Sequence, residues 1–174
     1  MDHLEELRET FPAAARDIKI NLPNVLAPGT LDANQAWGTA IASAYAVKNA
    51  SLLKALLLQA AENKIPDEVL EDAKAAAIMM AMNNVYYRFR HVVEKEVYTQ
   101  KPARLRMQRL AQVASNKADF ELFCLAVSAI NNCAMCVRSH EEAVLKGGLT
   151  EDHVHDAVRI AATIAASAQA LDTL

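Results

Sequence analysis

Two cysteines stand three residues apart in the segment Asn132-Cys133-Ala134-Met135-Cys136-Val137-Arg138-Ser139-His140. Thiols at this spacing, placed at the start of a helix, can close a reversible disulfide. The same helix start lowers the pKa of a thiol, because unpaired backbone N–H groups and the helix dipole favour an anion there. The pair therefore indicates redox catalysis by cysteine.

A histidine and a glutamate are spaced so that they can move protons near these thiols. His140 follows Cys136 by four residues, so the two share a helix face and His140 can act on Cys136 directly or through one water. Glu121 lies twelve residues before Cys133, on the preceding helix. A tight turn near residues 131–132 would fold that helix back and bring the carboxylate beside the imidazole, where it would orient the ring.

The roles of the two thiols depend on two arguments that conflict. We expect Asn132 to cap the motif helix, which would place Cys133 in its first turn, nearer the helix start and more exposed than Cys136. The register of His140 instead favours Cys136 as the nucleophile. We assign attack on a peroxide to Cys136 and the resolving role to Cys133, as the thiol that an external reductant reaches. The sulfenic acid left by that attack would condense with the neighbouring thiol to a disulfide.

The composition predicts an all-α protein. Hydrophobic residues make up 53% of the 174 residues but aromatic residues only 5%, because alanine supplies much of the apolar content, and this favours close helix packing. With 4 glycines and 5 prolines, the chain has few turn formers for a sandwich or barrel. Its length suits one domain with a core of its own.

Charge and apolar patterning limit the partners and the compartment. The net charge of −3 argues against nucleic acid as a partner. Asp2, Glu5 and Glu6 stand where a signal peptide would be basic, and the apolar stretches are interrupted too soon to span a bilayer. We therefore expect a cytoplasmic protein without membrane contact. In that compartment a Cys-x-x-Cys pair is more often catalytic or metal-binding than structural.

Apolar periodicity and end signals predict a series of helices. We expect them over residues 3–21, 32–47, 51–61, 66–94, 118–131 and 133–146, then from 150 to about 170, with a short helix near 103–113. Pro12 should kink or split the first helix. The segment Leu22–Thr30, which holds two further prolines and Gly29, is expected to be a loop. Gly147-Gly148 should stop the motif helix.

Two segments of the chain resemble each other at an offset of 84 residues. The segment Ile65–Ala73 is similar to Leu149–Ala157, and this offset places Asn49 and Leu52 where Cys133 and Cys136 would be. We predict a single domain over 1–174 built from a duplicated helical unit. Its degenerate first half would cover about 32–95, and its thiol-bearing second half about 118–172.

The spacing of the motif and several further segments match a known family. These segments are Ala13–Leu22, Gln35–Thr39, Met79–Arg88 (with Met82-Asn83-Asn84-Val85-Tyr86-Tyr87-Arg88), Phe120–Leu122, and Ser128–Asn131 running into the motif. With them the chain resembles the alkyl hydroperoxide reductase D (AhpD) family, within the carboxymuconolactone-decarboxylase-like superfamily. The resemblance runs nearly end to end.

The resemblance implies a fold, an activity and partners. The fold would be an AhpD-like all-α arrangement of a duplicated unit, assembled as a homotrimer or a multiple of it. The activity would be that of a peroxidase with no bound cofactor, whose disulfide is reduced by dihydrolipoamide carried on a lipoylated 2-oxoacid dehydrogenase component. Electrons would also pass to the peroxiredoxin AhpC.

The resemblance also implies roles for individual residues. Cys136 would be the peroxidatic thiol and Cys133 its resolving partner, with Glu121 and His140 as the proton relay. One residue departs from the family pattern, because well-known members carry histidine where this chain has Met135. A thioether cannot shuttle a proton, so either that histidine is dispensable or the relay here is rerouted, with a different rate or preferred substrate.

Two other classes of function remain open from the sequence. A zinc-binding module would use Cys133, Cys136 and His140, but no second Cys-x-x-Cys exists and the fourth ligand would have to be Glu121 or a distant histidine. A disulfide reductase or redox sensor would use the same thiols without peroxidase activity. The third cysteine, Cys124, is interpreted as a small core residue.

Overall fold

Helices make up the ordered structure of this protein. The computed structural model describes residues 2–174 and has no strand in that range, which confirms the predicted all-α fold. The elements are α1 (His3–Glu9), η1 (Ala13–Ala15), α2 (Arg16–Leu26), α3 (Ala33–Val47), α4 (Ala50–Glu62), α5 (Asp67–Val93), α6 (Glu96–Thr99), η2 (Gln108–Ala111), α7 (Lys117–Ile130), α8 (Ala134–Lys146) and α9 (Glu151–Asp172).

Helix α3 lies at the centre of the fold. Its start is fixed by a capping box, in which Oδ1 of Asp32 accepts from the backbone N–H of Gln35 and Oε1 of Gln35 accepts from that of Asp32. Every residue from Gln35 to Ala44 is buried, because α3 packs against α5, α7 and α9. Gly38 allows α3 and α7 to approach closely, since a Cβ atom at this position would lie 2.1 Å from the ring of Phe123 on α7.

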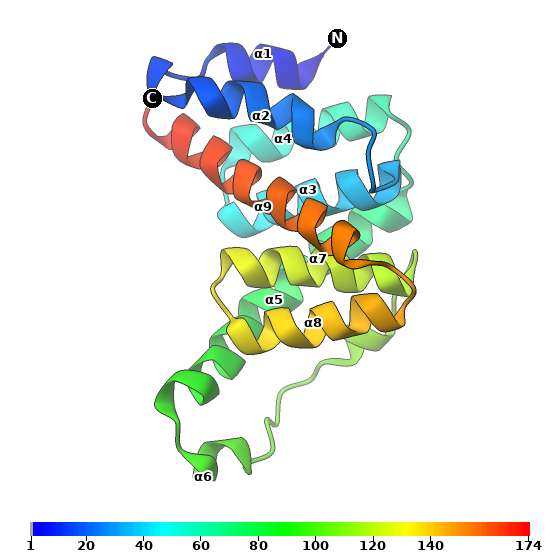
Figure 1. Cartoon of the computed structure of the whole chain (residues 1–174), viewed down its shortest axis with the longest axis vertical. Coiled ribbons are helices and arrows are strands. Elements are labelled where there is room, and N and C mark those ends of the chain that lie inside the picture. The colour runs from blue at the N-terminus through cyan, green and yellow to red at the C-terminus, as the bar shows by residue number, and fades with distance from the viewer. Residues whose placement is uncertain (1) are drawn as a thin grey trace.

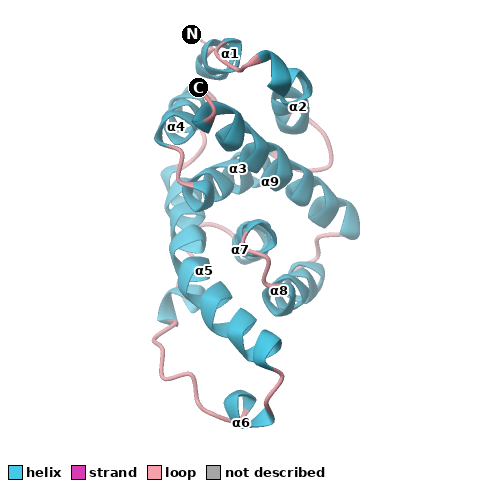
Figure 2. Cartoon of the chain, turned by 90° about the vertical axis from the view of Figure 1, so that its left-hand side faces the viewer, coloured by secondary structure: helices cyan, strands magenta, loops and turns pink. Residues whose placement is uncertain are grey.

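The helices form a long molecule with the thiol-bearing pair towards one end. Helices α1, α2 and α4 lie at the end that holds both chain termini, and α6 lies at the opposite end (Figure 1). Helices α7 and α8 lie side by side and α5 passes beside them (Figure 2), in contact with both. The site therefore has walls from three helices.

Helix positions follow the offset seen in the sequence. Helices α3, α4 and α5 begin at residues 33, 50 and 67, and α7, α8 and α9 begin at 117, 134 and 151. Left-handed residues precede the equivalent helices α4 and α8, with φ of 62° at Lys48 and 55° at Asn132. Nε2 of Gln35 donates to Oδ1 of Asp119, a residue 84 positions away, at 2.9 Å. The helix starts thus repeat at the spacing of the similar sequence segments, and the duplicated unit stays a prediction.

The N-terminal region differs from the expectation in one respect. Pro12 separates α1 from η1, so the predicted first helix is split. The predicted loop over Leu22–Thr30 is wrong in its first part, because α2 continues through Pro23 to Leu26. Leu22 is fully buried and α2 packs along α9, and this packing offsets the backbone hydrogen bond that Pro23 cannot donate.

The connection between α5 and α7 also differs. The short helix expected near 103–113 is only the single 3-10 turn η2, and α6 was not expected. Fully buried Asp72 accepts hydrogen bonds from the backbone N–H groups of Ala114 and Ser115 and from Arg109. Burial raises the pKa of this carboxyl, but these hydrogen bonds outweigh burial and lower it overall. A carboxylate far away in the sequence thus sets the path of this connection.

Candidate active site

The turn between α7 and α8 positions the two cysteines. Asn132 takes the left-handed conformation, with φ of 55°, and the backbone N–H of Cys133 donates to the carbonyl of Ser128 at 3.1 Å. Cys133 itself is the N-cap of α8, and its Sγ accepts from the N–H of Cys136 at 3.4 Å. The expectation that Asn132 caps this helix is therefore wrong. The chain reverses direction here, and asparagine tolerates the left-handed backbone that the reversal requires.

A disulfide joins Cys133 and Cys136, with Cα atoms 5.3 Å apart, a separation typical of disulfides. Cys133 is 0% exposed and Cys136 is 6% exposed. The expectation that Cys133 is the more exposed thiol, open to an external reductant, is wrong for this state. The turn covers Cys133, whereas Cys136 lies one helical turn further on and opens to a cavity.

Glu121 and His140 lie together, although they come from different helices. Oε2 of Glu121 lies 2.6 Å from Nδ1 of His140, and Lys117 Nζ lies 2.5 Å from the other carboxylate oxygen. Burial raises the pKa of Glu121, but the hydrogen bonds from His140 and Lys117 outweigh burial and lower it below its usual value. Glu121 is therefore an ionised acceptor at neutral pH, and the shared proton lies on Nδ1 of the imidazole.

The second ring nitrogen of His140 faces a thioether instead of a cysteine. Nε2 lies 3.2 Å from Sδ of Met80 on α5, and Met80 is fully buried. Within residues 2–174, His140 has no hydrogen bond to Cys133 or Cys136. In the disulfide-bonded state the imidazole is thus held between Glu121 and Met80.

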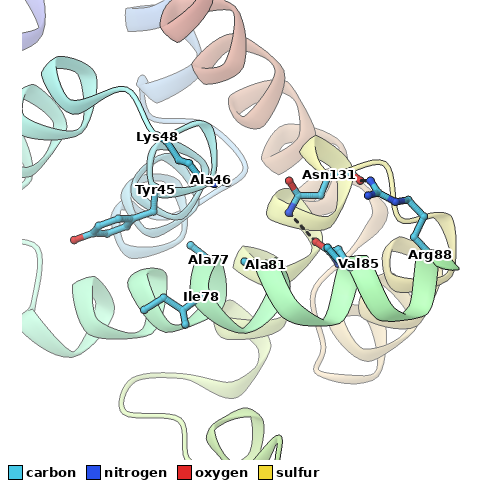
Figure 3. Close-up of a pocket in the computed structure, with 10 residues that line it drawn as sticks. Tyr45, Ala46, Lys48, Ala77, Ile78, Ala81, Val85, Arg88 and Asn131 are labelled. Carbon is cyan, nitrogen blue, oxygen red and sulfur yellow. Dashed lines mark hydrogen bonds between the residues drawn. The ribbon is translucent and has the colours of Figure 1, made fainter. Parts of the chain in front are cut away.

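Asn84 on α5 connects the turn to this arrangement. Its Nδ2 donates to Oγ of Ser128 at 2.9 Å and lies 3.7 Å from Sδ of Met80, and its Oδ1 accepts from Nδ2 of Asn131 at 3.0 Å. Arg88, one turn further along, donates to the carbonyl of Asn131 at 2.7 Å. Figure 3 shows Arg88 on α5 reaching Asn131 at the end of α7. Helix α5 therefore fixes the turn that precedes the cysteines.

Two cavities lie on either side of these contacts. The cavity of about 330 Å³ that Cys136 and His140 line also has walls of Asn83, Tyr87, Met107, Leu110, Met135 and Ser139. Met135, the residue that departs from the family pattern, is 37% exposed there. The other cavity, of about 360 Å³, is drawn in Figure 3 and contains neither a cysteine nor a histidine. Of these two cavities, only the one that Cys136 and His140 line places a redox sulfur beside space for a substrate.

The donor groups do not form a metal site. Among residues 2–174, no three His, Cys, Asp or Glu side chains lie close enough together to hold a metal ion. Both sulfurs are bonded to each other, and His140 turns its nitrogens to Glu121 and Met80. The zinc-binding alternative therefore has no ligand cluster in this state. Separately, no helix within the described range is long and apolar enough to cross a membrane.

The structure brings together all four residues that the sequence singled out, but it adds others. Cys124 is fully buried in the core, and burial raises the pKa of its thiol well above the usual value, which agrees with its interpretation as a core residue. The analysis of the sequence missed the roles of Met80, Asn83 and Asn84. The signal was available in a pair of asparagines on the inner face of a helix that is otherwise rich in alanine and methionine.

The fold and the site define a class: a helical protein with a redox-active Cys-x-x-Cys pair beside a His–Glu pair. Comparison with known proteins narrows that class. A model of the carboxymuconolactone decarboxylase family matches residues 98–174, which include α7, α8 and α9.

Similar proteins extend over almost the whole chain. "Alkyl hydroperoxide reductase AhpD" of Anaeromyxobacter sp. (strain K) is 58% identical over 172 residues, which cover 99% of this chain and 92% of that protein. AhpD of Solibacter usitatus (strain Ellin6076) is 47% identical, covering 97% and 95%. AhpD of Rhodospirillum centenum (strain ATCC 51521 / SW) is 43% identical, covering 97% and 90%. The chain therefore belongs to the alkyl hydroperoxide reductase AhpD family, and the prediction of an oxidoreductase enzyme is confirmed.

Proposed function

We propose that the protein reduces organic hydroperoxides by cycling Cys133 and Cys136 between dithiol and disulfide. The observation that carries this proposal is the position of Cys136, whose sulfur forms the disulfide and opens to a cavity that His140 also lines. His140 is backed by the ionised carboxylate of Glu121. A nucleophile, a base and an orienting carboxylate are the groups that activate a thiol.

The oxidising half of the cycle begins with proton transfer from the Cys136 thiol to His140. The thiolate attacks the outer oxygen of R–O–O–H, so an S–O bond forms and the O–O bond breaks. Sulfur is oxidised to a sulfenic acid, and the alkoxide that leaves takes the proton from His140 to become an alcohol. The Cys133 thiol then attacks the Cys136 sulfur, which forms the disulfide and releases water.

The reducing half of the cycle uses dihydrolipoamide, supplied by a lipoylated 2-oxoacid dehydrogenase component. Its thiolate attacks the Cys136 sulfur, because Cys136 lines the cavity and Cys133 does not. Cys133 then leaves as a thiolate at the N-cap of α8, where it accepts the N–H of Cys136 and the helix dipole favours an anion. The second lipoyl thiol attacks the mixed disulfide and frees Cys136, so two electrons reach the protein.

The same dithiol serves a second electron acceptor in this proposal. Reduced Cys136 would attack the disulfide of an AhpC-type peroxiredoxin and pass both electrons on. The names of the similar proteins describe alkyl hydroperoxide reductases, which fits a role in this reaction sequence.

Assembly into a homotrimer or a multiple of it is supported by one face of α5. Four large apolar side chains on that helix, Ile78, Val85, Phe89 and Val92, are each about half exposed or more, and their spacing places them along one side of the helix. A contiguous exposed apolar surface of this kind marks a contact site. Sedimentation at several concentrations tests the assembly, and replacing Phe89 and Val92 by Glu should dissociate it.

The experiment that tests the activity uses dihydrolipoamide as the only reductant and cumene hydroperoxide as the oxidant. We expect the wild type to consume both in equal amounts, and Cys133→Ser and Cys136→Ser to lose this turnover. Cys124→Ser is the matched control, because Cys124 lies in the core and takes no part in the cycle. Unchanged turnover in either of the first two variants would refute the mechanism. Disulfide reduction without peroxide consumption in the wild type would favour the disulfide-reductase alternative.

A further inference from the structure

One polar atom at the catalytic cavity, the side-chain oxygen of Asn83, has no hydrogen-bond partner in the part of the chain that the structure describes. Asn83 on α5 is 5% exposed and lines the cavity with Cys136 and His140. Its Oδ1 is buried and, among residues 2–174, accepts no hydrogen bond. Burying an amide without a hydrogen bond costs stability, so a group of this kind in a native protein requires an explanation.

The neighbouring asparagine shows that α5 can satisfy such a group. Asn84 is equally buried, yet both ends of its carboxamide are bonded to Ser128 and Asn131 on the α7 side of the site. Asn83 is the residue before Asn84 and lies one turn before Tyr87, and it is among the residues that line the cavity. The contacts of the fold therefore explain the burial of Asn84 but not that of the side-chain oxygen of Asn83.

We propose that the carboxamide of Asn83 binds the –O–O–H group of the substrate, a role that rests on the proposed function. A hydroperoxide has one O–H donor and an inner oxygen that accepts. A carboxamide has the complementary pair, an oxygen acceptor and N–H donors. Oδ1 of Asn83 is shielded from solvent in the disulfide-bonded state, so the carboxamide turns towards the cavity to provide both partners and to hold the outer oxygen towards Cys136.

The same contact assists the reaction itself. When the thiolate attacks the outer oxygen, negative charge grows on the inner oxygen as the O–O bond breaks. An N–H of Asn83 that already points at this oxygen stabilises the charge without reorganisation. Apart from Ser139, the remaining walls are Tyr87, Met107, Leu110 and Met135, which are largely apolar and suit an organic R group. Asn83 is therefore a catalytic residue for organic hydroperoxides.

The test is a single turnover of pre-reduced protein with cumene hydroperoxide, in wild type, Asn83→Leu and Asn83→Ser. Removing one donor to a developing oxyanion slows reactions by roughly 100-fold or more, so we expect Asn83→Leu to react at least about 10-fold more slowly. Asn83→Ser, which keeps a smaller hydrogen-bonding group, should fall between the two. Iodoacetamide has no peroxide bond, so its rate of alkylating Cys136 should be unchanged in both variants.

The alkylation rate separates substrate binding from a structural effect. Asn84→Ala should disturb the turn and slow peroxide reduction and alkylation together, and it serves as the contrast. The proposal is overturned if Asn83→Leu reduces cumene hydroperoxide at the wild-type rate, or if both of its rates fall in the same proportion. Inert wild-type protein would instead refute the proposed function, and the inference about Asn83 with it.

Discussion

Nε2 of His140 lies 3.2 Å from Sδ of Met80, and not beside a cysteine, when the disulfide is closed. The opposite nitrogen contacts Glu121 at 2.6 Å. Because Glu121 is ionised and can only accept, its contact fixes the proton of the imidazole on Nδ1. The thioether lies against the opposite nitrogen, so the two contacts together hold the ring in one orientation while the disulfide is closed.

Met80→Leu tests whether this sulfur orients the ring. Leucine has a similar volume and should keep the fold, with a stability cost below about 1.5 kcal/mol. Loss of the contact between the imidazole and the thioether, worth about 0.5–1 kcal/mol, should slow single-turnover reduction of cumene hydroperoxide by roughly two- to fivefold. Met82→Leu, a half-buried methionine on the same helix, is the control and should react like the wild type. Equal rates in the two variants would show that Met80 only fills space.

Asn84 is predicted to be the main polar contribution of α5 to the stability of the thiol turn. Asn84→Ala removes the hydrogen bonds to buried Ser128 and half-buried Asn131, which should lower the free energy of unfolding by about 2–3 kcal/mol. The disulfide should also become easier to reduce, because the turn no longer holds the sulfurs together. Urea unfolding and a glutathione redox titration measure the two effects. Asn24→Ala, at an exposed position of α2, should stay within about 0.5 kcal/mol of the wild type.

The carboxylate of Glu121 gives stability that depends on pH. Its pKa is lowered from the usual value of 4.5, so the stabilisation is fully present above pH 4.5 and is lost as the pH falls through the lowered pKa. Glu121→Gln should cost about 1 kcal/mol at neutral pH and progressively less in acid, which denaturant unfolding at a series of pH values would show. Glu142→Gln, in an exposed ion pair with Lys146, is the control and should show a small difference at every pH. A Glu121→Gln difference that does not depend on pH would contradict the assignment.

Local signals in the sequence were sufficient for much of this structure. The cap at Asp32 and the start of α9 after Thr150 follow from residues within one helix turn. The pairing of Glu121 with His140 follows from the tight turn between two consecutive helices. The predictions that were wrong concern segments whose path depends on residues far away in the sequence. Helix α2 runs through Pro23 because of α9, and the path before α7 depends on Asp72.

The residues of the site also divide into those that local signals predict and those that depend on distant segments. The four residues at the thiol pair could be predicted because they share two neighbouring helices and a regular spacing. The burial of Cys133 could not, because it depends on a left-handed residue at 132 and on the carbonyl of Ser128. Met80 and Asn84 act from α5, whose contact with the turn appears only when the chain is folded.

From the 84-residue spacing of the helix starts we predict that residues 49–52 can carry a disulfide but not the chemistry. Asn49 caps α4 as Cys133 caps α8, and its Oδ1 accepts from the N–H of Leu52 at 2.9 Å. In a Cys133→Ser, Cys136→Ser background, Asn49→Cys with Leu52→Cys should therefore form a disulfide in air, because the cap sets the same spacing between the side chains.

This engineered pair should have no peroxidase activity. The offset places Leu56 and Trp37 where the second unit has His140 and Glu121, so no base activates the new thiols. Replacing Leu52, which is fully buried, should cost about 2–4 kcal/mol of stability, in the range of large-to-small core changes. Mass spectrometry after alkylation counts the free thiols, and the single variant Asn49→Cys is the control that cannot close a bond with position 52. Two free thiols at 49 and 52 under air would contradict the shared geometry, and peroxide turnover by this pair would contradict the need for His140 and Glu121.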